Sequence, residues 1–281
     1  MNSYTTMYGV IGDPIRHSKS PVMLNRAFRE AGIDGAYAAF HVLPDRLGEA
    51  IAGIRALGFR GLNVTIPHKI EVMRYLDEIH PGALAAGAVN TIVNENGRLF
   101  GYNTDGIGYV RSLKEEAMPS LAGRNVVVLG AGGASRGILW ALAQEKPAKL
   151  TLANRTPEKA RQLADAFASE FEVTPIAWDD GLRAACAEAD VVINTTSVGM
   201  SPKVEETPID PAWLKAGAVA SDLIYNPLKT KFVREAEALG CIGHGGLGMF
   251  VYQGAYAFEY WTGQPAPVGA MREAVMASFP A

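Results

Sequence analysis

The sequence predicts an α/β fold of two domains, and three observations support this prediction. Short apolar runs rich in β-branched residues alternate with amphipathic stretches of helical length, a pattern typical of strand–helix–strand units. Many of the 30 glycines stand where an apolar run gives way to such a stretch, because the chain must turn sharply there. The 281 residues are enough for two medium domains, and Met118–Ser120 marks a break between two halves.

The first half is a mixed series of predicted strands and helices. Ser20 as N-cap and Pro21 at the first helical position predict the start of one helix, and Pro67 ends a strand. The expected elements are a strand at 8–11, a helix at 22–31, a strand at 36–42, a helix at 44–57, a strand at 61–66, short helices at 71–77 and 82–86, a hairpin of 87–93 with 98–100, and a helix at 107–117. The turn Asn94–Gly97 closes the hairpin.

The second half alternates strand and helix more regularly. Strands are expected at 126–129, 150–153, 173–176, 191–194 and 219–224, and helices at 138–144, 157–168, 180–187 and 229–239. A further helix begins within 245–253, and Pro265 separates it from a last one near 268–277. Such alternation predicts a parallel sheet covered by helices on both faces.

Composition excludes several classes of function. A formal net charge of −3 gives no case for nucleic acid or an anionic membrane surface as a partner. No apolar run reaches the ~18 residues of a membrane span, and the first residues lack the basic and apolar regions of a signal peptide. Cys186 and Cys241 are isolated, without metal-ligand spacing, so we expect reduced thiols in a cytoplasmic protein and no metal site.

The segment Asn125–Gly137 organises the second half. An apolar β-branched run stops at glycines, and a helical pattern follows, which is the context of a dinucleotide-binding loop. Small residues let the backbone approach a pyrophosphate at the positive end of the helix. The match to G-x-G-x-x-G is imperfect, because Ser135 stands at the third glycine position. The predicted loop consists of Gly130, Ala131, Gly132, Gly133, Ala134 and Ser135.

The next predicted strand ends in residues that favour NADP over NAD. An NAD-binding fold places Asp or Glu roughly 20 residues past the loop, on the ribose 2′-hydroxyl. This chain has Asn154 and Arg155 there, followed by Thr156 and Lys159. A carboxylate would repel a 2′-phosphate, whereas a guanidinium can bind it with two hydrogen bonds. The alternative is a tight turn with a solvated arginine.

Polar residues gather at two places in the first half. Ser18 and Ser20 lie at a predicted helix N-terminus, where hydroxyls and free N–H groups suit a carboxylate, although a simple helix cap explains Ser20 equally well. The strand at 61–66 brings four polar residues to its carboxyl end, where open α/β sheets bind ligands. They are Asn63, Thr65, His68 and Lys69. For His68 we expect packing rather than catalysis.

Taken together, these motifs resemble the shikimate dehydrogenase family along nearly the whole chain. The matching pieces are Ser18–Pro21, Asn63–Lys69, Gly87–Thr91, Asn103–Gly106, Gly130–Ser135, Asn154–Thr156, Asn194–Met200, and Gly246–Met249 followed by Gln253. The resemblance implies reversible, NADP-dependent reduction of 3-dehydroshikimate to shikimate in the pathway to chorismate and aromatic amino acids. It also implies a substrate domain at 1–105 joined by C-terminal helices at about 246–281, a Rossmann-like NADP domain at 106–245, and a cleft between them.

The resemblance assigns roles residue by residue. Lys69 and Asp105 would form the catalytic pair, and Ser18 and Ser20 would bind the substrate carboxylate. The hydroxylated ring would be surrounded by Thr65, Lys69, Asn90, Asp105, Tyr225 and Gln253. NADP would be held by Gly130–Ser135 and by Asn154, Arg155, Thr156 and Lys159, with Leu223, Gly246 and Met249 near the nicotinamide.

Several alternatives stay open from the sequence. The chain could be a quinate/shikimate dehydrogenase that uses NAD, against which Arg155 argues, or a non-catalytic NADP-sensing protein, which would need neither Lys69 nor Asp105. Lys69 alone could be a solvated lysine, and Asp105 could cap a helix. We expect a small-molecule substrate, no metal, no nucleic-acid or membrane partner, and a monomer or homodimer.

Overall fold

The computed structural model describes residues 1–279 and divides into two compact units. The first unit comprises Met1–Gly108 and Val251–Ala281, of which the last two residues lie outside the described part. The second comprises Tyr109–Phe250. Helices α4 (Asp105–Glu116) and α9 (Leu247–Thr262) carry the chain from one unit to the other. That the first unit binds substrate and the second NADP stays a prediction at this stage.

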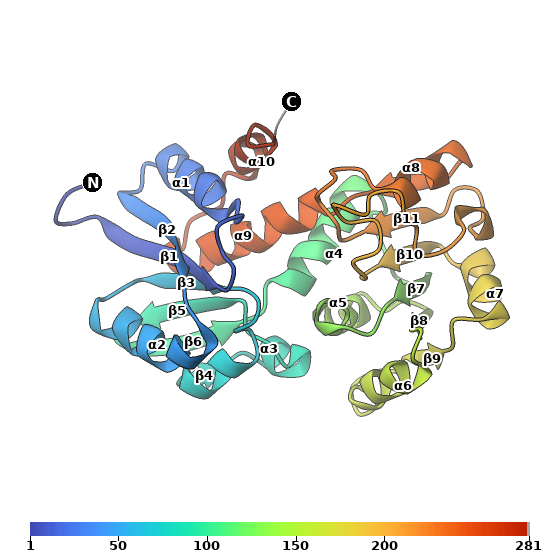
Figure 1. Cartoon of the computed structure of the whole chain (residues 1–281), viewed down its shortest axis with the longest axis horizontal. Helices are drawn as coiled ribbons and strands as arrows, with labels where there is room; N and C mark the ends of the chain where they lie inside the picture. Colours follow the sequence, from blue (N-terminus) through green and yellow to red (C-terminus); the bar gives the residue numbers. More distant parts are fainter. Residues whose placement is uncertain (280–281) are drawn as a thin grey trace. The chain divides into compact units, whose positions relative to one another are not determined.

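The first unit is built on a six-stranded mixed sheet in the order β2-β1-β3-β5-β6-β4 (Figure 1). Strands β1, β2 and β3 are parallel to one another, β5 runs antiparallel to both β3 and β6, and β4 is parallel to β6. Its elements are β1 (Thr6–Gly12), α1 (Ser20–Glu30), β2 (Gly35–His41), α2 (Leu47–Ala56), β3 (Gly61–Val64), β4 (Glu78–Ile79), α3 (Pro81–Ala86), β5 (Thr91–Glu95), β6 (Arg98–Tyr102) and α10 (Val268–Met276). The predicted hairpin is therefore present as β5–β6.

Local details of the first unit differ from the sequence expectation. Helix α1 begins at Ser20, and Lys19 holds the N-cap position without a side-chain cap. The expected N-cap role of Ser20 was wrong, because its buried hydroxyl interacts with the Tyr37 phenol instead of a backbone N–H. Strand β3 stops at Val64, and the helix expected at 44–57 opens with a 3₁₀ turn at Pro44–Arg46.

Trp261, near the end of helix α9, completes the core of the first unit. Trp261 of α9 is 2% exposed and packs against the rings of Tyr8 and Tyr37. Its indole Nε1 donates a 2.9 Å hydrogen bond to the carbonyl of Ile92 in β5. A Cβ at Gly61 would come within 2.1 Å of the same nitrogen. Trp261 and the buried Phe258 of α9 therefore pack in the core, and glycine is required where the indole crosses β3.

The second unit is a doubly wound parallel sheet in the order β12-β11-β10-β7-β8-β9 (Figure 1). Its elements are β7 (Asn125–Leu129), α5 (Gly133–Gln144), β8 (Lys149–Ala153), α6 (Pro157–Asp165), β9 (Thr174–Ile176), α7 (Asp180–Glu188), β10 (Val191–Asn194), β11 (Val219–Asp222), α8 (Lys231–Ala238) and β12 (Ile242–His244). The strand order reverses between β7 and β10, and ligands of such sheets bind outside the carboxyl ends at this point. The predicted parallel α/β fold is confirmed, although the short strand β12 was not foreseen.

Two neighbouring strands of this sheet are buried along their whole length. Strands β10 and β11 contain only buried residues, because helices cover both faces of a parallel sheet. Within residues 1–279, no helix combines the length and the apolar character that crossing a membrane requires.

We predict that Trp261→Phe lowers the free energy of unfolding by about 1–3 kcal/mol, since it leaves the buried carbonyl of Ile92 without the indole donor. Urea denaturation followed by circular dichroism measures the change. The matched control is Tyr260→Phe in the same helix. This residue is 37% exposed, and the loss should stay below ~0.5 kcal/mol. Equal losses in the two variants would contradict the prediction.

Candidate active site

Lys69 and Asp105 form an ion pair within the first unit. Lys69 follows β3, and Asp105 is the first residue of α4. Lys69 Nζ lies 2.7 Å from Asp105 Oδ2, and the two side chains are 28% and 18% exposed. The pair is thus sheltered yet reachable from solvent, as a proton-transfer site requires. Lys69 is not merely a solvated lysine.

The Asp105 carboxylate is oriented by Asn90. Asn90 Nδ2 donates to Asp105 Oδ1 at 2.8 Å, while Asn90 Oδ1 accepts from the Thr104 backbone N–H at 2.8 Å. Asn90 is 3% exposed, so its orientation is set by these bonds. The backbone N–H of Asp105 is bonded by Asn103 Oδ1 at 3.1 Å. The Asn103 side chain, and not the Asp105 carboxylate, therefore accepts the first backbone N–H of α4.

The polar network around Asn90 extends across the first unit. Asn63 Nδ2 donates to Thr91 Oγ1 at 3.1 Å, and Thr91 Oγ1 donates to Asn90 Oδ1 at 3.0 Å. The Tyr37 hydroxyl donates to Asn63 Oδ1 at 2.7 Å and interacts with the Ser20 hydroxyl. Burial raises the pKa of Tyr37 well above its ordinary value, so the phenol stays neutral and a donor. Sequence reasoning missed Tyr37, because a tyrosine in an apolar strand gives no separate signal.

The remaining candidate substrate residues lie on three elements. Ser18 is partly exposed, and its Oγ accepts from the Ser20 backbone N–H at 3.3 Å. Thr65 follows β3 and is also partly exposed, with its methyl group directed toward Gly12. Gln253 lies on α9, where its backbone approaches Gly108 so closely that a Cβ there would be 2.7 Å away. The first unit thus contains all but one of these candidates, since Tyr225 lies in the second.

His68, next to the candidate lysine, is a structural residue. It is 1% exposed, and its Nε2 lies 2.7 Å from the carbonyl of Val42. A carbonyl oxygen can only accept, so Nε2 carries the proton and donates it there. The expected packing role is consistent with this geometry.

The glycine loop of the second unit leads from β7 into α5. Gly130 has φ +103°, a conformation that favours glycine, and Gly132, Gly133 and Ala134 are exposed. A Cβ at Gly132 or Gly133 would meet nothing within 4 Å, so the space above the helix N-terminus is open to a ligand. Helix α5 has no acidic residue in its first turn, and its positive end suits a pyrophosphate.

The Ser135 hydroxyl closes this loop by hydrogen bonds that the sequence did not predict. Its Oγ donates to the carbonyl of Gly130 at 2.7 Å and accepts from the Gly132 N–H at 3.1 Å. Thr195 Oγ1, from the loop after β10, lies 2.7 Å from Ser135 Oγ. The departure from the third glycine therefore cross-links the loop to its neighbour instead of weakening it.

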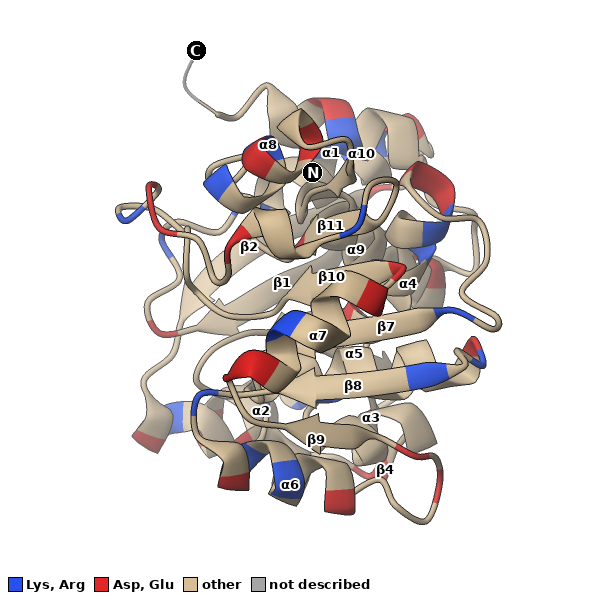
Figure 2. Cartoon of the chain, turned by 90° about the vertical axis from the view of Figure 1, so that its right-hand side faces the viewer, with Lys and Arg blue, Asp and Glu red and all other residues tan. Residues whose placement is uncertain are grey.

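The turn between β8 and α6 contains the candidates for a 2′-phosphate. Asn154 Oδ1 accepts from the Ala131 N–H at 3.2 Å, and its Nδ2 donates to the carbonyl of Thr156 at 2.9 Å. Asn154 thus joins the glycine loop to this turn, and the acidic residue of NAD-binding folds is absent from the position. Arg155, Thr156 and Lys159 are exposed. Figure 2 shows charges of both signs along α6. On this helix Arg161 pairs with Glu158 at 3.2 Å.

A hydrogen bond to the buried Asp222 holds the segment that follows β11. Asp222 is fully buried, and its carboxylate accepts from the Ile224 N–H at 3.0 Å. Leu223 and Tyr225 are partly exposed, and Tyr225 stacks on Phe250. A Cβ at Gly246 would lie 2.1 Å from the carbonyl oxygen of Leu223, which is why glycine stands there. Met249 follows in the first turn of α9 and is partly exposed.

Together these features fit NADP. An open glycine loop at a helix N-terminus suits the pyrophosphate, cations at the next strand end suit a 2′-phosphate, and the β11 end offers apolar and aromatic surface. Across residues 1–279, no group of His, Cys, Asp or Glu is arranged to hold a metal ion.

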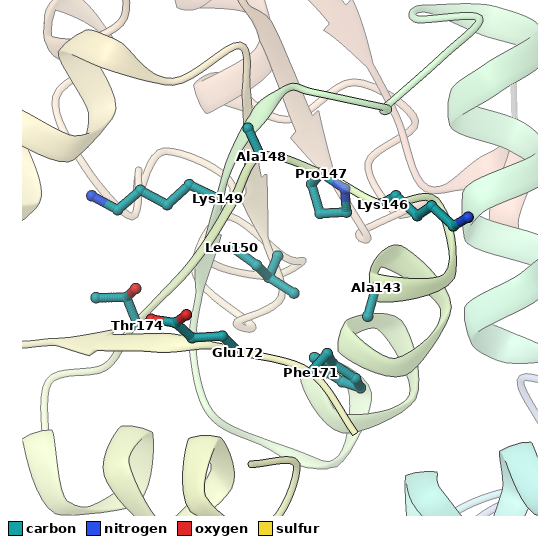
Figure 3. Close-up of a pocket in the computed structure, with 9 residues that line it drawn as sticks. All are labelled: Ala143, Lys146, Pro147, Ala148, Lys149, Leu150, Phe171, Glu172 and Thr174. Atoms are coloured by element: carbon teal, nitrogen blue, oxygen red, sulfur yellow. The ribbon is translucent and has the colours of Figure 1, made fainter. Parts of the chain in front are cut away.

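A hollow of about 480 Å³ lies in the second unit, where strands β8 and β9 begin. It is lined by the end of α5, the start of β8 and the residues before β9, as Figure 3 shows. The Lys146 and Lys149 side chains point away from one another. No pair of cations converges there, so this hollow adds no candidate site.

Comparisons with known proteins agree with this assignment. Residues 10–92 match the family described as the shikimate dehydrogenase substrate binding domain, residues 112–209 match shikimate/quinate 5-dehydrogenase, and residues 246–276 match the shikimate 5′-dehydrogenase C-terminal domain. A curated relative from Moorella thermoacetica, named shikimate dehydrogenase (NADP(+)), is 50% identical over 98% of this chain and 95% of its own. The chain belongs to the shikimate dehydrogenase family.

Solved structures of shikimate dehydrogenases have the same fold. One, in complex with NADP+, is 41% identical with a TM-score of 0.92 and covers 100% of this chain and 98% of its own. Another, from Thermus thermophilus in complex with NADP(H) and shikimate, is 35% identical with a TM-score of 0.88 and covers 98% of this chain and all of its own. The predicted family and fold are thereby confirmed.

The buried carboxyl group of Asp222 makes the free energy of unfolding depend on pH. Burial raises its pKa from 3.8 to about 6, against three hydrogen bonds that lower it. Between these values the folded state holds a proton that the unfolded state has released, so raising the pH favours unfolding. The stabilisation by protonated Asp222 is complete below pH ~4 and lost as the pH rises through ~6, a total of about 3 kcal/mol.

Urea titrations of the wild type and Asp222→Asn between pH 4 and 7 test this prediction. Other carboxylates titrate in both proteins, so the difference between the two curves is the relevant quantity. We expect the wild type to lose about 3 kcal/mol more than the variant over this range. Parallel curves would contradict the raised pKa.

Proposed function

We propose that this chain is an NADP-dependent shikimate dehydrogenase, which reduces 3-dehydroshikimate reversibly to shikimate on the route to chorismate and aromatic amino acids. The observation that carries the proposal is the Lys69–Asp105 ion pair, oriented by Asn90. A protein that only sensed NADP would have no use for this pair. The full-length similarity to curated NADP(+) shikimate dehydrogenases supports the same conclusion.

The second unit would hold the cofactor, which supplies the hydride when bound. Gly130–Ser135 would hold the pyrophosphate, and Asn154, Arg155, Thr156 and Lys159 would hold the adenosine with its 2′-phosphate. Leu223, Gly246 and Met249 would border the nicotinamide. The cation at Arg155 and the lack of a carboxylate beside it favour NADP over NAD.

Lys69 would handle the proton. In the direction of reduction, negative charge develops on the carbonyl oxygen, and the Lys69 ammonium stabilises this charge and donates a proton to it. In the reverse direction the neutral amine accepts the proton of the hydroxyl group. Asp105 holds the ammonium in place from 2.7 Å, and Asn90 keeps the carboxylate from rotating away.

The substrate would be recognised by hydroxyl and amide groups. Ser18 and Ser20 would bind its carboxylate at the start of α1. The ring hydroxyls would be bound by Thr65, Lys69, Asn90, Asp105, Tyr225 and Gln253. We also propose that the chain acts in the cytoplasm, which agrees with two cysteines that are buried and unpaired by disulfide, and that it is a monomer or homodimer.

The direct test is the appearance of NADPH absorbance after shikimate is added with NADP. We expect kcat/KM to be highest for shikimate with NADP, because Arg155 provides a partner for the 2′-phosphate that NAD lacks. Quinate and NAD are tested in the same assay. A clear preference for quinate with NAD, or no turnover of either acid, would overturn the proposal.

We predict that Lys69→Ala lowers kcat by about 10²- to 10⁴-fold, the usual contribution of a general acid–base group. NADP should still bind, since its candidate residues lie elsewhere in the chain, and calorimetric titration checks this. Lys149→Ala, at an exposed position of the second unit, is the matched control and should turn over like the wild type. Wild-type kcat in Lys69→Ala would remove this residue from the mechanism.

We predict that Arg155→Ala raises KM for NADP much more than KM for shikimate, because the 2′-phosphate loses a charge-assisted hydrogen-bond donor. The exposed Arg161→Ala, six residues further along, removes a cation of the same kind that is paired with Glu158 and should change neither constant appreciably. Steady-state kinetics with each substrate varied in turn measure both effects. A rise of equal size in both constants would count against the assignment.

A further inference from the structure

We propose that Asp222 is a positioning residue, whose buried carboxylate fixes the segment Leu223–Tyr225 in the conformation that presents Leu223 to the nicotinamide. This inference rests on the proposed function. Asp222 itself is 0% exposed. It acts through the residues that follow it, not by touching substrate or cofactor.

The Asp222 carboxylate and its three hydrogen-bond donors, which we call the clamp, join three segments of the second unit. The donors belong to Asn194, Ile224 and Thr230. Asp222 Oδ1 accepts from the backbone N–H of Ile224 at 3.0 Å. Its Oδ2 accepts from Asn194 Nδ2 at the end of β10, at 3.0 Å, and from Thr230 Oγ1 just before α8, at 2.9 Å. All three partners are neutral, so the carboxylate serves here as a multiple acceptor and not as half of an ion pair.

The bonds around Asp222 fix the backbone on both sides of Leu223. The Leu223 N–H donates to the carbonyl of Asn194 at 3.1 Å. The Ile224 peptide is held at both its polar groups, because its N–H bonds Asp222 and its carbonyl accepts from the Gly246 N–H at 3.1 Å. With the backbone held in this way, the partly exposed side chain of Leu223 has a defined direction.

The same network reaches the glycine loop. Asn194 Oδ1 accepts from the N–H and the hydroxyl of Thr196. The residue between them, Thr195, has its Oγ1 2.7 Å from the carbonyl oxygen of Leu129 and 2.7 Å from Ser135 Oγ. Because the Ser135 proton is donated to Gly130, Thr195 is the donor when the two hydroxyls bond. Asp222 therefore ties the β11 end to the loop proposed to hold the pyrophosphate. This arrangement sets the spacing between the two parts of the cofactor site.

A carboxylate is suited to this position, and asparagine is not. A carboxylate accepts on both oxygens and can satisfy three donors, whereas an amide has one acceptor oxygen and two donors of its own. Asparagine at 222 would direct an NH₂ group either at the Ile224 N–H or at the Asn194 and Thr230 donors. The raised pKa of Asp222 shows that its charge is costly to bury. A retained buried charge is consistent with a role other than stability.

The experiment compares three variants at the clamp with one control. Asp222→Asn removes one acceptor and introduces a donor, Thr230→Val removes one donor, and Thr230→Ser keeps it. The control is Ser221→Ala, which removes a buried hydroxyl from the preceding position of β11, where it bonds Tyr109 and His244 instead of the clamp.

Three quantities are measured on each folded variant. The first is kcat with shikimate and NADP. The second is the fluorescence emission of NADPH bound without substrate, which reports the surroundings of the nicotinamide. The third is the affinity for 2′,5′-ADP, which carries the 2′-phosphate and lacks the nicotinamide.

We expect Asp222→Asn to lower kcat by about 10- to 100-fold, the effect of a misplacement near 1 Å, and to shift the emission of bound NADPH toward that of free NADPH. Thr230→Val should change both in the same direction to a smaller extent, and Thr230→Ser should restore them. Affinity for 2′,5′-ADP should not change, since Arg155 is outside the clamp. Ser221→Ala should leave all three quantities as in the wild type.

Wild-type kcat and emission in Asp222→Asn would overturn the proposal, as would an equal effect of Ser221→Ala. A parallel loss of 2′,5′-ADP affinity would show general disruption of the unit and would also overturn it. If Asp222→Asn does not fold, the pair Thr230→Val and Thr230→Ser decides the same question. If the wild type does not oxidise shikimate, the proposed function fails, and the emission of bound NADPH still tests the clamp.

Discussion

The ion pair between Lys69 and Asp105 is the interaction on which the rest of the first unit depends. Its two residues are 36 positions apart. Lys69 lies in the segment after β3, Asp105 opens α4, and the β5–β6 hairpin lies between them in the chain. Holding both charges partly sheltered is tolerable only while they remain together, because removal of one leaves the other uncompensated. The hairpin and its buried polar residues are therefore arranged to keep them together.

Neutral groups complete that arrangement. The chain of hydrogen bonds from Tyr37 through Asn63, Thr91 and Asn90 to Asp105 joins strands β2, β3 and β5 to the start of α4. Buried amides and hydroxyls that are all bonded hold one another in single orientations. The conformational entropy of such a site is lost during folding, so little further entropy is lost when substrate binds.

The second unit also holds a sheltered carboxylate in place, but with neutral hydrogen-bond donors and not with a cation. Asp222 has hydrogen-bond donors around it but no cation among its bonded partners, and burial raises its pKa accordingly. At the glycine loop, Ser135 bonds the Gly130 carbonyl within the loop, and Asn154 joins the loop to the turn after β8. The backbone that would meet the cofactor is thus held by side chains that need not touch it.

The sequence by itself determined the fold class, the family and the main candidate residues. Periodic apolar runs, glycines at strand ends and proline-marked boundaries are local signals, and the motifs around Lys69, Asp105 and Gly130 stand contiguously in the chain. Only the tertiary structure decided that Asn90 orients Asp105, that Ser20 turns to Tyr37 instead of capping α1, and that Ser135 and Asp222 brace their loops. Each of these contacts joins residues that are distant in sequence or depends on which way a side chain turns, and residue type and spacing do not encode either one.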